Sequence, residues 1–301
     1  MRHVSSEVVV VAVARDRCQV ASDLAALTKP RVVAMVLVTT LVGYDVGLTG
    51  SADYLRMIHL LIGTLLAAGG TLALNQYWER ELDAWMERTR ARPLPGGRLH
   101  PLEALLLGVS LTLLGTVYLA ALVGPLVALV TAATAILYLC AYTPLKRRTA
   151  LCTLVGAVPG ALPPVAGWAA ARGDVTLGAW VLFGVLFLWQ LPHTLSIARL
   201  HREDYARAGV RVLPVIDPDG ASTERQIVLA CLALLAVSLL PAVIGWTGPV
   251  YLAGALVLGL AFVAVGVVQA LAPSARSARR VLLVSLLYLP LLLGLLALDR
   301  I

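Results

Sequence analysis

Long apolar stretches recur along nearly the whole chain, and they limit what this sequence can fold into. Each is about 20 residues long, which is enough to cross roughly 30 Å of hydrocarbon as a helix. Of the 301 residues, 59% are hydrophobic and only 14% are charged, unlike a soluble globular domain. The sequence therefore predicts an all-α, polytopic membrane protein. Its nine-transmembrane-helix bundle is predicted to have spans at residues 32–50, 56–76, 101–122, 125–144, 150–171, 176–198, 226–246, 249–271 and 280–298.

Lysine and arginine are distributed unevenly between the connections of these predicted spans. Of the 24 such residues, all but Arg56, Arg172 and Arg300 precede the first span or follow an even-numbered one. Because basic residues accumulate on the cytoplasmic side, we expect a cytoplasmic N-terminus and a C-terminus on the outer side of the plasma (inner) membrane. The net charge of +7 follows from this topology, so the expected surroundings are a lipid bilayer and no nucleic acid.

The chain divides into a short N-terminal extension and one large membrane domain. Residues 1–26 precede the first span, and residues 15–27 mix charged and apolar side chains at helical spacing. Such a segment is typical of a helix that lies along the membrane surface. Residues 27–301 are then expected to form a single intramembrane domain.

An acidic stripe follows the second predicted span. Asn75, Glu79, Asp83 and Glu87 recur every four residues, which places them along one side of a helix. Carboxylates beside arginines at a membrane boundary suit Mg²⁺ with a polyphosphate, because the metal takes oxygen ligands and guanidinium groups take phosphate oxygens. The alternative is an ordinary basic loop with salt bridges between residues four apart. The neighbouring arginines are Arg80, Arg88, Arg90, Arg92 and Arg98.

The fourth predicted span ends in Tyr142-Thr143-Pro144-Leu145-Lys146-Arg147-Arg148. A basic stop at the cytoplasmic face accounts for the lysine and arginines. It does not account for Tyr142 and Lys146 lying four residues apart across a proline near the membrane surface. A lysine can meet a phosphate, and a tyrosine can donate to an oxygen, so both are candidate ligand-binding residues.

A second polar cluster follows the sixth predicted span. Gln190, His193 and Asp204 share one helix face if the helix continues past Pro192. A histidine inside a membrane helix suggests a function, because polar groups there are costly. The alternative is a histidine satisfied by a backbone carbonyl. The cluster continues with Glu203, Asp204 and Tyr205.

Two acidic clusters on the same side of a helical bundle, each followed by basic residues, resemble the UbiA superfamily of intramembrane prenyltransferases. Within it, six strings in order resemble the protohaem IX farnesyltransferases. These strings are L-T-K-P-R-V at 27–32, N-x-x-x-E-x-x-x-D-x-x-M-x-R-T-x-x-R-P-L at 75–94, Y-T-P-L-K-R-R-T at 142–149, G-A-L-P-P-V-A-G at 160–167, W-Q-L-P-H at 189–193 and E-D-Y-A-R-A-G-V-x-V-L-P-V at 203–215.

The resemblance implies transfer of a farnesyl group from farnesyl diphosphate to a vinyl group of haem B, giving haem O, with Mg²⁺ assisting departure of the diphosphate. Haem B is then a substrate rather than a bound cofactor. The implied metal ligands are Asn75, Glu79 and Asp83, with Asp204 and Glu203 opposite them. The implied substrate-binding residues are Arg88, Arg92, Tyr142, Lys146, Arg147, Gln190, His193 and Tyr205, with His193 on the haem side as an iron ligand or a propionate partner.

Two other functions stay open at this point. A related prenyltransferase could act on another aromatic acceptor, such as a quinone precursor. A secondary transporter of an anion would place its charges near the bilayer midplane on broken helices, whereas here the charges collect at one face.

The resemblance also implies haem A synthase or terminal oxidase assembly proteins as partners. Family members commonly have aspartate at the positions of Glu79, Glu81 and Glu203, a difference that changes geometry more than chemistry.

Overall fold

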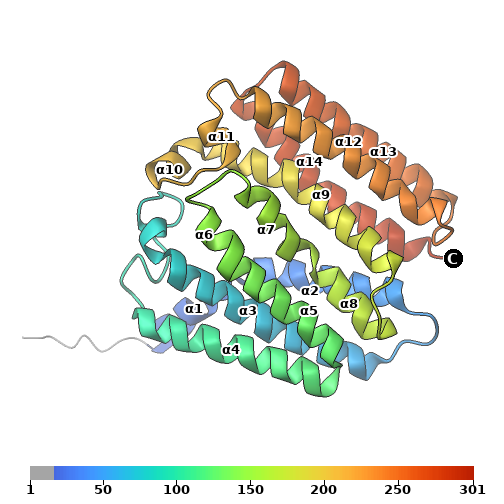
Figure 1. The fold of residues 1–301 in the computed structure, drawn as a ribbon, viewed down its shortest axis with the longest axis horizontal. Coiled ribbons are helices and arrows are strands. Elements are labelled where there is room, and N and C mark those ends of the chain that lie inside the picture. The colour runs from blue at the N-terminus through green and yellow to red at the C-terminus, as the bar shows by residue number, and fades with distance from the viewer. Residues whose placement is uncertain (1–16) are drawn as a thin grey trace, which may run out of the picture.

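The computed structural model describes residues 17–301, so residues 1–16 and most of the predicted N-terminal extension lie outside the described part. The described residues form helices joined by turns and short connections, with one isolated bridge between Thr247 and Arg300. Long helices lie side by side, and short ones gather at one end of the bundle (Figure 1). The helices are α1 Arg17–Leu27, α2 Pro30–Gly47, α3 Tyr54–Ala84, α4 Pro101–Leu122, α5 Pro125–Ile136, η1 Leu137–Tyr142, α6 Thr143–Leu145, α7 Cys152–Ala161, α8 Pro163–Arg172, α9 Leu177–Leu200, α10 Arg202–Arg207, α11 Leu213–Ile216, α12 Ala221–Val243, α13 Pro249–Leu271 and α14 Ala275–Leu298.

Within residues 17–301, nine helical segments are long and apolar enough to cross a membrane, which confirms the predicted all-α bundle. Prolines begin several of them, including α4 at Pro101 and α13 at Pro249, where the missing N–H has no intrahelical partner to lose. Two spans are assembled from shorter helices. The fourth comprises α5, η1 and α6, and the fifth comprises α7 and α8, which meet at Leu162.

The acidic stripe differs from its prediction at one end. Helix α3 continues eight residues beyond the predicted span limit and carries Asn75, Glu79 and Asp83. It ends at Ala84, so Glu87 lies in the following turn, where it is exposed and faces Arg207 at 3.8 Å. The prediction that Glu87 continues the stripe is therefore wrong, because the four-residue period holds only while the helix lasts.

Small residues allow the helices around the centre of the bundle to approach closely. A Cβ atom added at Gly167 in α8 would lie 2.0 Å from the carbonyl oxygen of Thr40 in α2. One added at Gly43 would lie 2.1 Å from the carbonyl oxygen of Pro164. This close contact is typical of membrane helices, which gain packing where the backbones meet. Beside it, a buried cluster that includes Tyr44 and Leu60 fills the bundle toward the connection between α2 and α3.

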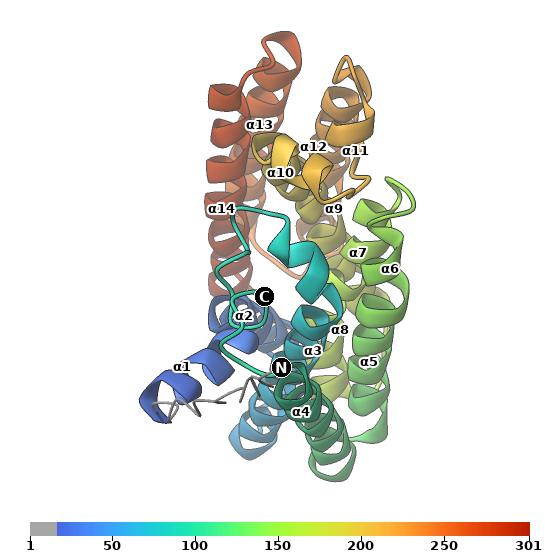
Figure 2. The same cartoon turned by 90° about the vertical axis from the view of Figure 1, so that its left-hand side faces the viewer.

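The connections that follow α3 and α9 lie at the same end of the bundle (Figure 2). The backbone N–H of Glu87 donates to Asp204 Oδ1 at 3.4 Å, and the N–H of Arg211 donates to the carbonyl of Lys146 at 2.7 Å. Helix α1 is held at this end too, since Arg98 Nε lies 3.0 Å from both carboxylate oxygens of Asp23. The connections that carry the two polar clusters therefore meet at one end of the bundle.

Candidate active site

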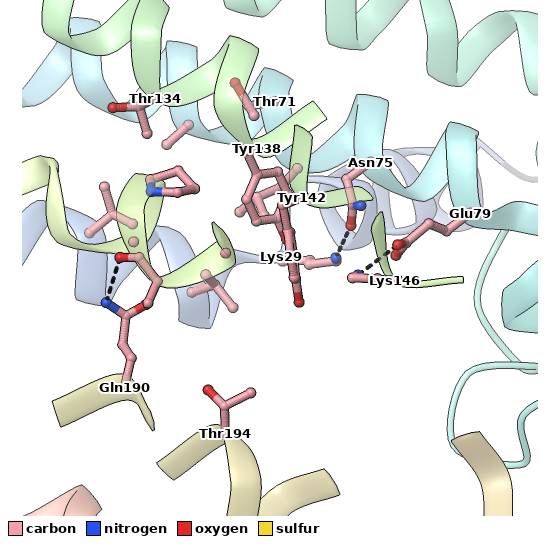
Figure 3. Close-up of a pocket in the computed structure, with 18 of the residues that line it drawn as sticks. Lys29, Thr71, Asn75, Glu79, Thr134, Tyr138, Tyr142, Lys146, Gln190 and Thr194 are labelled. Carbon is pink, nitrogen blue, oxygen red and sulfur yellow. Dashed lines mark hydrogen bonds and ion pairs between the residues drawn. The ribbon is translucent and has the colours of Figure 1, made fainter. Parts of the chain in front are cut away.

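A cavity of about 470 Å³ opens between α2, α3, the fourth segment (α5, η1 and α6), the fifth (α7 and α8) and α9, and polar and apolar side chains line opposite ends of it. Figure 3 shows Asn75, Glu79 and Lys146 at one end, Tyr138 and Tyr142 between, and Gln190 and Thr194 on the side formed by α9. The charged lining residues, together with Asn75, are Lys29, Asn75, Glu79, Asp83, Arg88, Arg92 and Lys146. The cavity has the shape of a site for a molecule with a charged head and an apolar tail.

Each residue of the α3 stripe is paired with a cation from another part of the chain. Lys29 donates to Asn75 Oδ1 at 2.9 Å, and Lys146 Nζ lies 2.6 Å from Glu79 Oε1.

The third pair joins Arg92 to Asp83 Oδ2 at 2.6 Å, and the side chain of Asp83 is only 2% exposed. Three positive groups from three different segments thus converge on one helix. They stand where the cavity becomes polar, and guanidinium and ammonium groups in such an arrangement are suited to bind phosphate.

Asn75 is held in one orientation by a chain of hydrogen bonds. Its amide nitrogen donates to Thr143 Oγ1 at 3.2 Å, and that hydroxyl donates its own proton to the carbonyl of Tyr138 at 2.8 Å. The hydroxyl is therefore an acceptor toward Asn75, so the amide oxygen must point the other way, to Lys29. A small polar network thus presents an oxygen rather than an amide nitrogen to the cation.

Lys29 is a site residue that the functional prediction left out. It is the only described non-glycine residue with positive φ, at 50°, and it precedes Pro30. Desolvation, followed by the positive charges of Arg92 and Lys146, lowers the pKa of Lys29 to about 7. Neighbouring cations that disfavour one another's charge would be stabilised by an anion. The signal in the sequence is a lysine directly before a proline at the start of an apolar span.

A wide helical turn places two tyrosines on the cavity wall. Residues 137–142 form a π-helix, a conformation that is often found at functional sites. The rings of Tyr138 and Tyr142 lie 5.3 Å apart, and Lys146 Nζ lies 4.4 Å from the centre of the Tyr142 ring. Gly156 makes room for that ring, because a Cβ atom there would lie 2.5 Å from it. Tyr142 and Lys146 are thus in contact at the cavity wall, and their role in binding a ligand stays a prediction.

The remainder of the cavity is largely apolar, although several of its residues are threonines. The hydroxyls of Thr40, Thr71 and Thr134 donate to carbonyls of their own helices at 2.7–2.8 Å, which satisfies these groups locally. Gln190, one of the predicted site residues, lines the cavity and donates to the carbonyls of Leu186 and Ala157. No described acidic or basic side chain lines this part, so it suits a hydrocarbon chain.

The other predicted binding residues fall inside and outside the cavity. Arg88 and Tyr205 line it, whereas Arg147 is exposed and is not part of its wall. Glu203 is exposed on α10, and Asp204 contacts Arg207 and the N–H of Glu87 outside the wall. Although desolvation opposes it, the hydrogen bonds from Arg207 and Glu87 lower the pKa of Asp204. The second acidic cluster is thus close to the first, and a metal role for Glu203 and Asp204 stays a prediction.

The single helix face predicted for Gln190, His193 and Asp204 is wrong. Helix α9 does continue past Pro192, but it ends at Leu200, and α10 begins at Arg202 in a new direction (Figure 1). His193 lies outside the cavity wall and faces α14, where Nδ1 is 2.8 Å from Ser285 Oγ. The alternative of a histidine satisfied by a backbone carbonyl is also not what the structure has, since the partner is a hydroxyl.

The donors on α3 fit Mg²⁺ as a partner of a phosphate ligand. Within residues 17–301, no group of three histidine, cysteine, aspartate or glutamate side chains is arranged to hold a metal ion. Mg²⁺ is commonly held by one or two carboxylates, with substrate phosphates and water completing the shell. Glu79 and Asp83, with the amide oxygen of Asn75, supply that number and kind of oxygen along one wall.

The fold and this site define a class of protein: a helical membrane protein whose largely apolar cavity has a polar end lined by cationic side chains. Residues 36–293 match the model of the UbiA prenyltransferase family, and the chain belongs to that family. It is 52% identical to the protoheme IX farnesyltransferase of Solibacter usitatus over 287 residues, covering 92% of this chain and 98% of the relative. It is 42% identical to the protoheme IX farnesyltransferase of Myxococcus xanthus, covering 94% and 96% of the two chains.

Solved structures share the fold at low sequence identity. A structure described for digeranylgeranylglyceryl phosphate synthase matches with a TM-score of 0.79 at 15% identity, covering 93% of this chain and 98% of that one. A UbiA homolog from Archaeoglobus fulgidus bound to DMAPP and Mg²⁺ matches with a TM-score of 0.63 at 14% identity, covering 92% and 99%. The nine-segment bundle is therefore the fold of this family.

Proposed function

We propose that this protein is a prenyltransferase that moves a farnesyl group from farnesyl diphosphate to a vinyl group of haem B, giving haem O. The observation that carries the proposal is the row of three cations paired along α3, at the polar end of an otherwise apolar cavity. A diphosphate fits the polar end with its three cations, and a prenyl chain fits the apolar remainder of the cavity. Haem B as acceptor is supported by the names of the relatives, which are protoheme IX farnesyltransferases.

The reaction needs a leaving group whose charge is neutralised. The bond between C1 of the prenyl chain and the diphosphate oxygen breaks, and the electron pair leaves with the diphosphate. Lys29, Arg92 and Lys146 bind the phosphate oxygens and stabilise the charge that develops on them. Mg²⁺, when held by Asn75, Glu79 and Asp83, adds neutralising charge; DMAPP and Mg²⁺ are bound in the Archaeoglobus fulgidus homolog.

The apolar part of the cavity protects the prenyl group from reaction with water. Its hydrocarbon walls exclude water from C1, so that the carbon is not captured before the acceptor reaches it. The rings of Tyr138 and Tyr142 lie between the charged head and the apolar tail, where they can stabilise developing positive charge. C1 then bonds to the terminal carbon of the vinyl group, which leaves the positive charge on the other vinyl carbon. Water adds to that carbon and releases a proton, which gives the hydroxyl of haem O.

The purified protein in lipid nanodiscs provides the test of this function. With haem B, labelled farnesyl diphosphate and Mg²⁺, we expect label in a product with the mass of haem O. The same assay with a quinone precursor, such as 4-hydroxybenzoate, examines the other acceptor class. Label in the quinone precursor and none in haem would refute haem B as acceptor. Uptake of an anion into sealed vesicles, with no prenyl product, would support transport instead.

The orientation in the membrane is a further part of the proposal. We infer a cytoplasmic N-terminus, an outer C-terminus and a location in the plasma (inner) membrane, where haem A synthase or oxidase assembly proteins are the expected partners. We also infer that residues 27–301 form one catalytic domain, with α1 on the membrane surface. This orientation is supported by the positions of the connections after α3 and α9, which are rich in arginine and lie at the same end of the bundle (Figure 2).

Cysteine labelling tests this orientation. In a variant with serine at Cys18 and Cys140, the two exposed native cysteines, new cysteines at Glu81 and Arg202 should react only from the cytoplasmic side. A cysteine at Asp174, in the connection between α8 and α9, should react only from outside. Labelling of Glu81 and Arg202 from opposite sides would contradict a single site formed by both connections.

A further inference from the structure

The side chain of Gln190 on α9 holds an amide oxygen open to the cavity. Gln190 lines the cavity, and its Nε2 donates to the carbonyl of Leu186 at 3.0 Å and to that of Ala157 at 3.3 Å. Carbonyl oxygens only accept hydrogen bonds, so both amide protons are used and the orientation of the carboxamide is fixed. Oε1 has no partner among the described residues, and it is not one of the fully enclosed unpartnered polar atoms. It is therefore an acceptor with free lone pairs.

Gly160 in α7 makes the space for this oxygen. A Cβ atom added at Gly160 would lie 2.0 Å from Gln190 Oε1, so with alanine there the carboxamide would have to move. Pro163 and Pro164 have no N–H, and the carbonyls four residues earlier, at Pro159 and Gly160, therefore lack their usual helical donors. Both of these earlier residues line the cavity. In a membrane-crossing segment such carbonyls need a donor from elsewhere, and ordered water is one.

Thr194 adds a hydroxyl one turn further along α9. It lines the cavity and is half-buried, and its side chain points from α9 toward the cavity, as that of Gln190 does (Figure 3). Its hydroxyl has no hydrogen-bond partner within residues 17–301, whereas other threonines of the cavity bond to carbonyls of their own helices. Residues four apart on a helix have Cβ atoms about 5–6 Å apart. One water molecule with hydrogen bonds of about 2.8 Å on each side bridges such a separation.

We propose that Gln190 and Thr194 hold the water that becomes the hydroxyl of the product, with Gly160 as the residue that positions Gln190. This inference rests on the proposed function and names the residues of its last step. The water oxygen bonds to the cationic vinyl carbon with one lone pair, and one O–H bond of the water breaks. Gln190 Oε1 accepts a hydrogen bond from the water and stabilises the positive charge that develops on it. The proton leaves to solvent water, because neither an amide nor a hydroxyl is basic enough to keep it.

The place of this water is compatible with a prenyl group that must not be hydrolysed. Glu79 and Lys146 lie on the other side of the cavity from Gln190 (Figure 3). The diphosphate, and C1 attached to it, are expected on that side. A water bound by two side chains is fixed beside α9, so it reacts with a carbon that the acceptor brings there and leaves C1 to the vinyl group.

The ratio of two products, measured by mass spectrometry after reaction in nanodiscs, tests this role. Without a held water, the vinyl cation loses a proton from the adjacent carbon, which gives a farnesylated haem that is lighter than haem O by one water. Gln190→Met and Thr194→Val should each lower the ratio of haem O to this dehydrated product roughly 2- to 10-fold, the usual weight of one neutral hydrogen bond. Gly160→Ala should lower it as well, because the new methyl group displaces the carboxamide.

Two variants outside the cavity wall are the controls. Ser196→Ala removes a hydroxyl of α9 that donates to the Pro192 carbonyl, and Gly294→Ala adds a Cβ atom that meets nothing within 4 Å. Both should keep the wild-type ratio, and a lowered ratio in them too would overturn the proposal. An unchanged ratio in Gln190→Met and Thr194→Val, at whatever rate, would also overturn it and leave the proposed function standing. No farnesylated haem of either kind from the wild type would refute the proposed function, and the role of this water with it.

Discussion

Replacing Asp83 by asparagine should reduce the transfer rate about 100- to 1,000-fold, as the loss of one preorganised electrostatic group in an active site commonly does. The carboxylate is 2% exposed and lies 2.6 Å from Arg92, so it has one charged partner and very little water. Asparagine keeps the shape but removes the charge that would bind Mg²⁺ and orient the guanidinium.

Glu81→Gln is the matched control for this variant. Glu81 is on the same helix, its side chain is 85% exposed, and its neighbour Arg80 is 3.4 Å away. The substitution makes the same change of charge outside the cavity, so transfer should stay near the wild-type rate. We expect kcat to fall in Asp83→Asn more than KM rises, because the interaction is used when the diphosphate leaves. Wild-type kcat in Asp83→Asn with Mg²⁺ present would remove Asp83 from the site.

The bundle and the α3 stripe could be predicted because each depends on a local period. An apolar run of about 20 residues has few other structures open to it, and a four-residue repeat needs only that a helix persists. The end of α3 was not predictable in the same way. The turn after Ala84 is stabilised by contacts from elsewhere in the chain, including the approach of Glu87 to Asp204 across 117 positions.

The site residues that were predicted wrongly or missed depend on backbone geometry, and the spacing of side chains along the sequence does not reveal that geometry. The position of Asp204 depends on the break between α9 and α10 at His201, and that of Tyr142 on a π-helical turn. Lys29 reaches the cavity from a left-handed backbone conformation before a proline. The direction of His193 depends on Ser285, which is 92 positions away. Apart from the lysine–proline pair at Lys29, none of these features is visible in a pattern within one segment.

Lys146→Met should cause two separate losses. It leaves Glu79 as an unpaired carboxylate that is 9% exposed, and breaking a buried pair in this way costs up to about 3–5 kcal/mol of stability. It also removes a charge-assisted contact to the diphosphate, of about 1.5–3 kcal/mol, which corresponds to roughly a 10- to 150-fold loss in binding. Thermal unfolding in detergent should show the first loss. The single variant cannot separate a structural role for Lys146 from a role in binding.

Variants at both positions make that separation, with binding of farnesyl thiodiphosphate, a non-reactive analogue, measured without Mg²⁺. Under these conditions Glu79 only competes with the diphosphate for Lys146 Nζ, so Glu79→Gln should bind the analogue more tightly than the wild type does. The double variant Glu79→Gln/Lys146→Met should be more stable than Lys146→Met, because no carboxylate is left unpaired. It should nevertheless bind the analogue roughly 10- to 150-fold more weakly than Glu79→Gln does. Equal binding by the double variant and Glu79→Gln would mean that Lys146 only neutralises Glu79, and the diphosphate would then depend on Lys29 and Arg92.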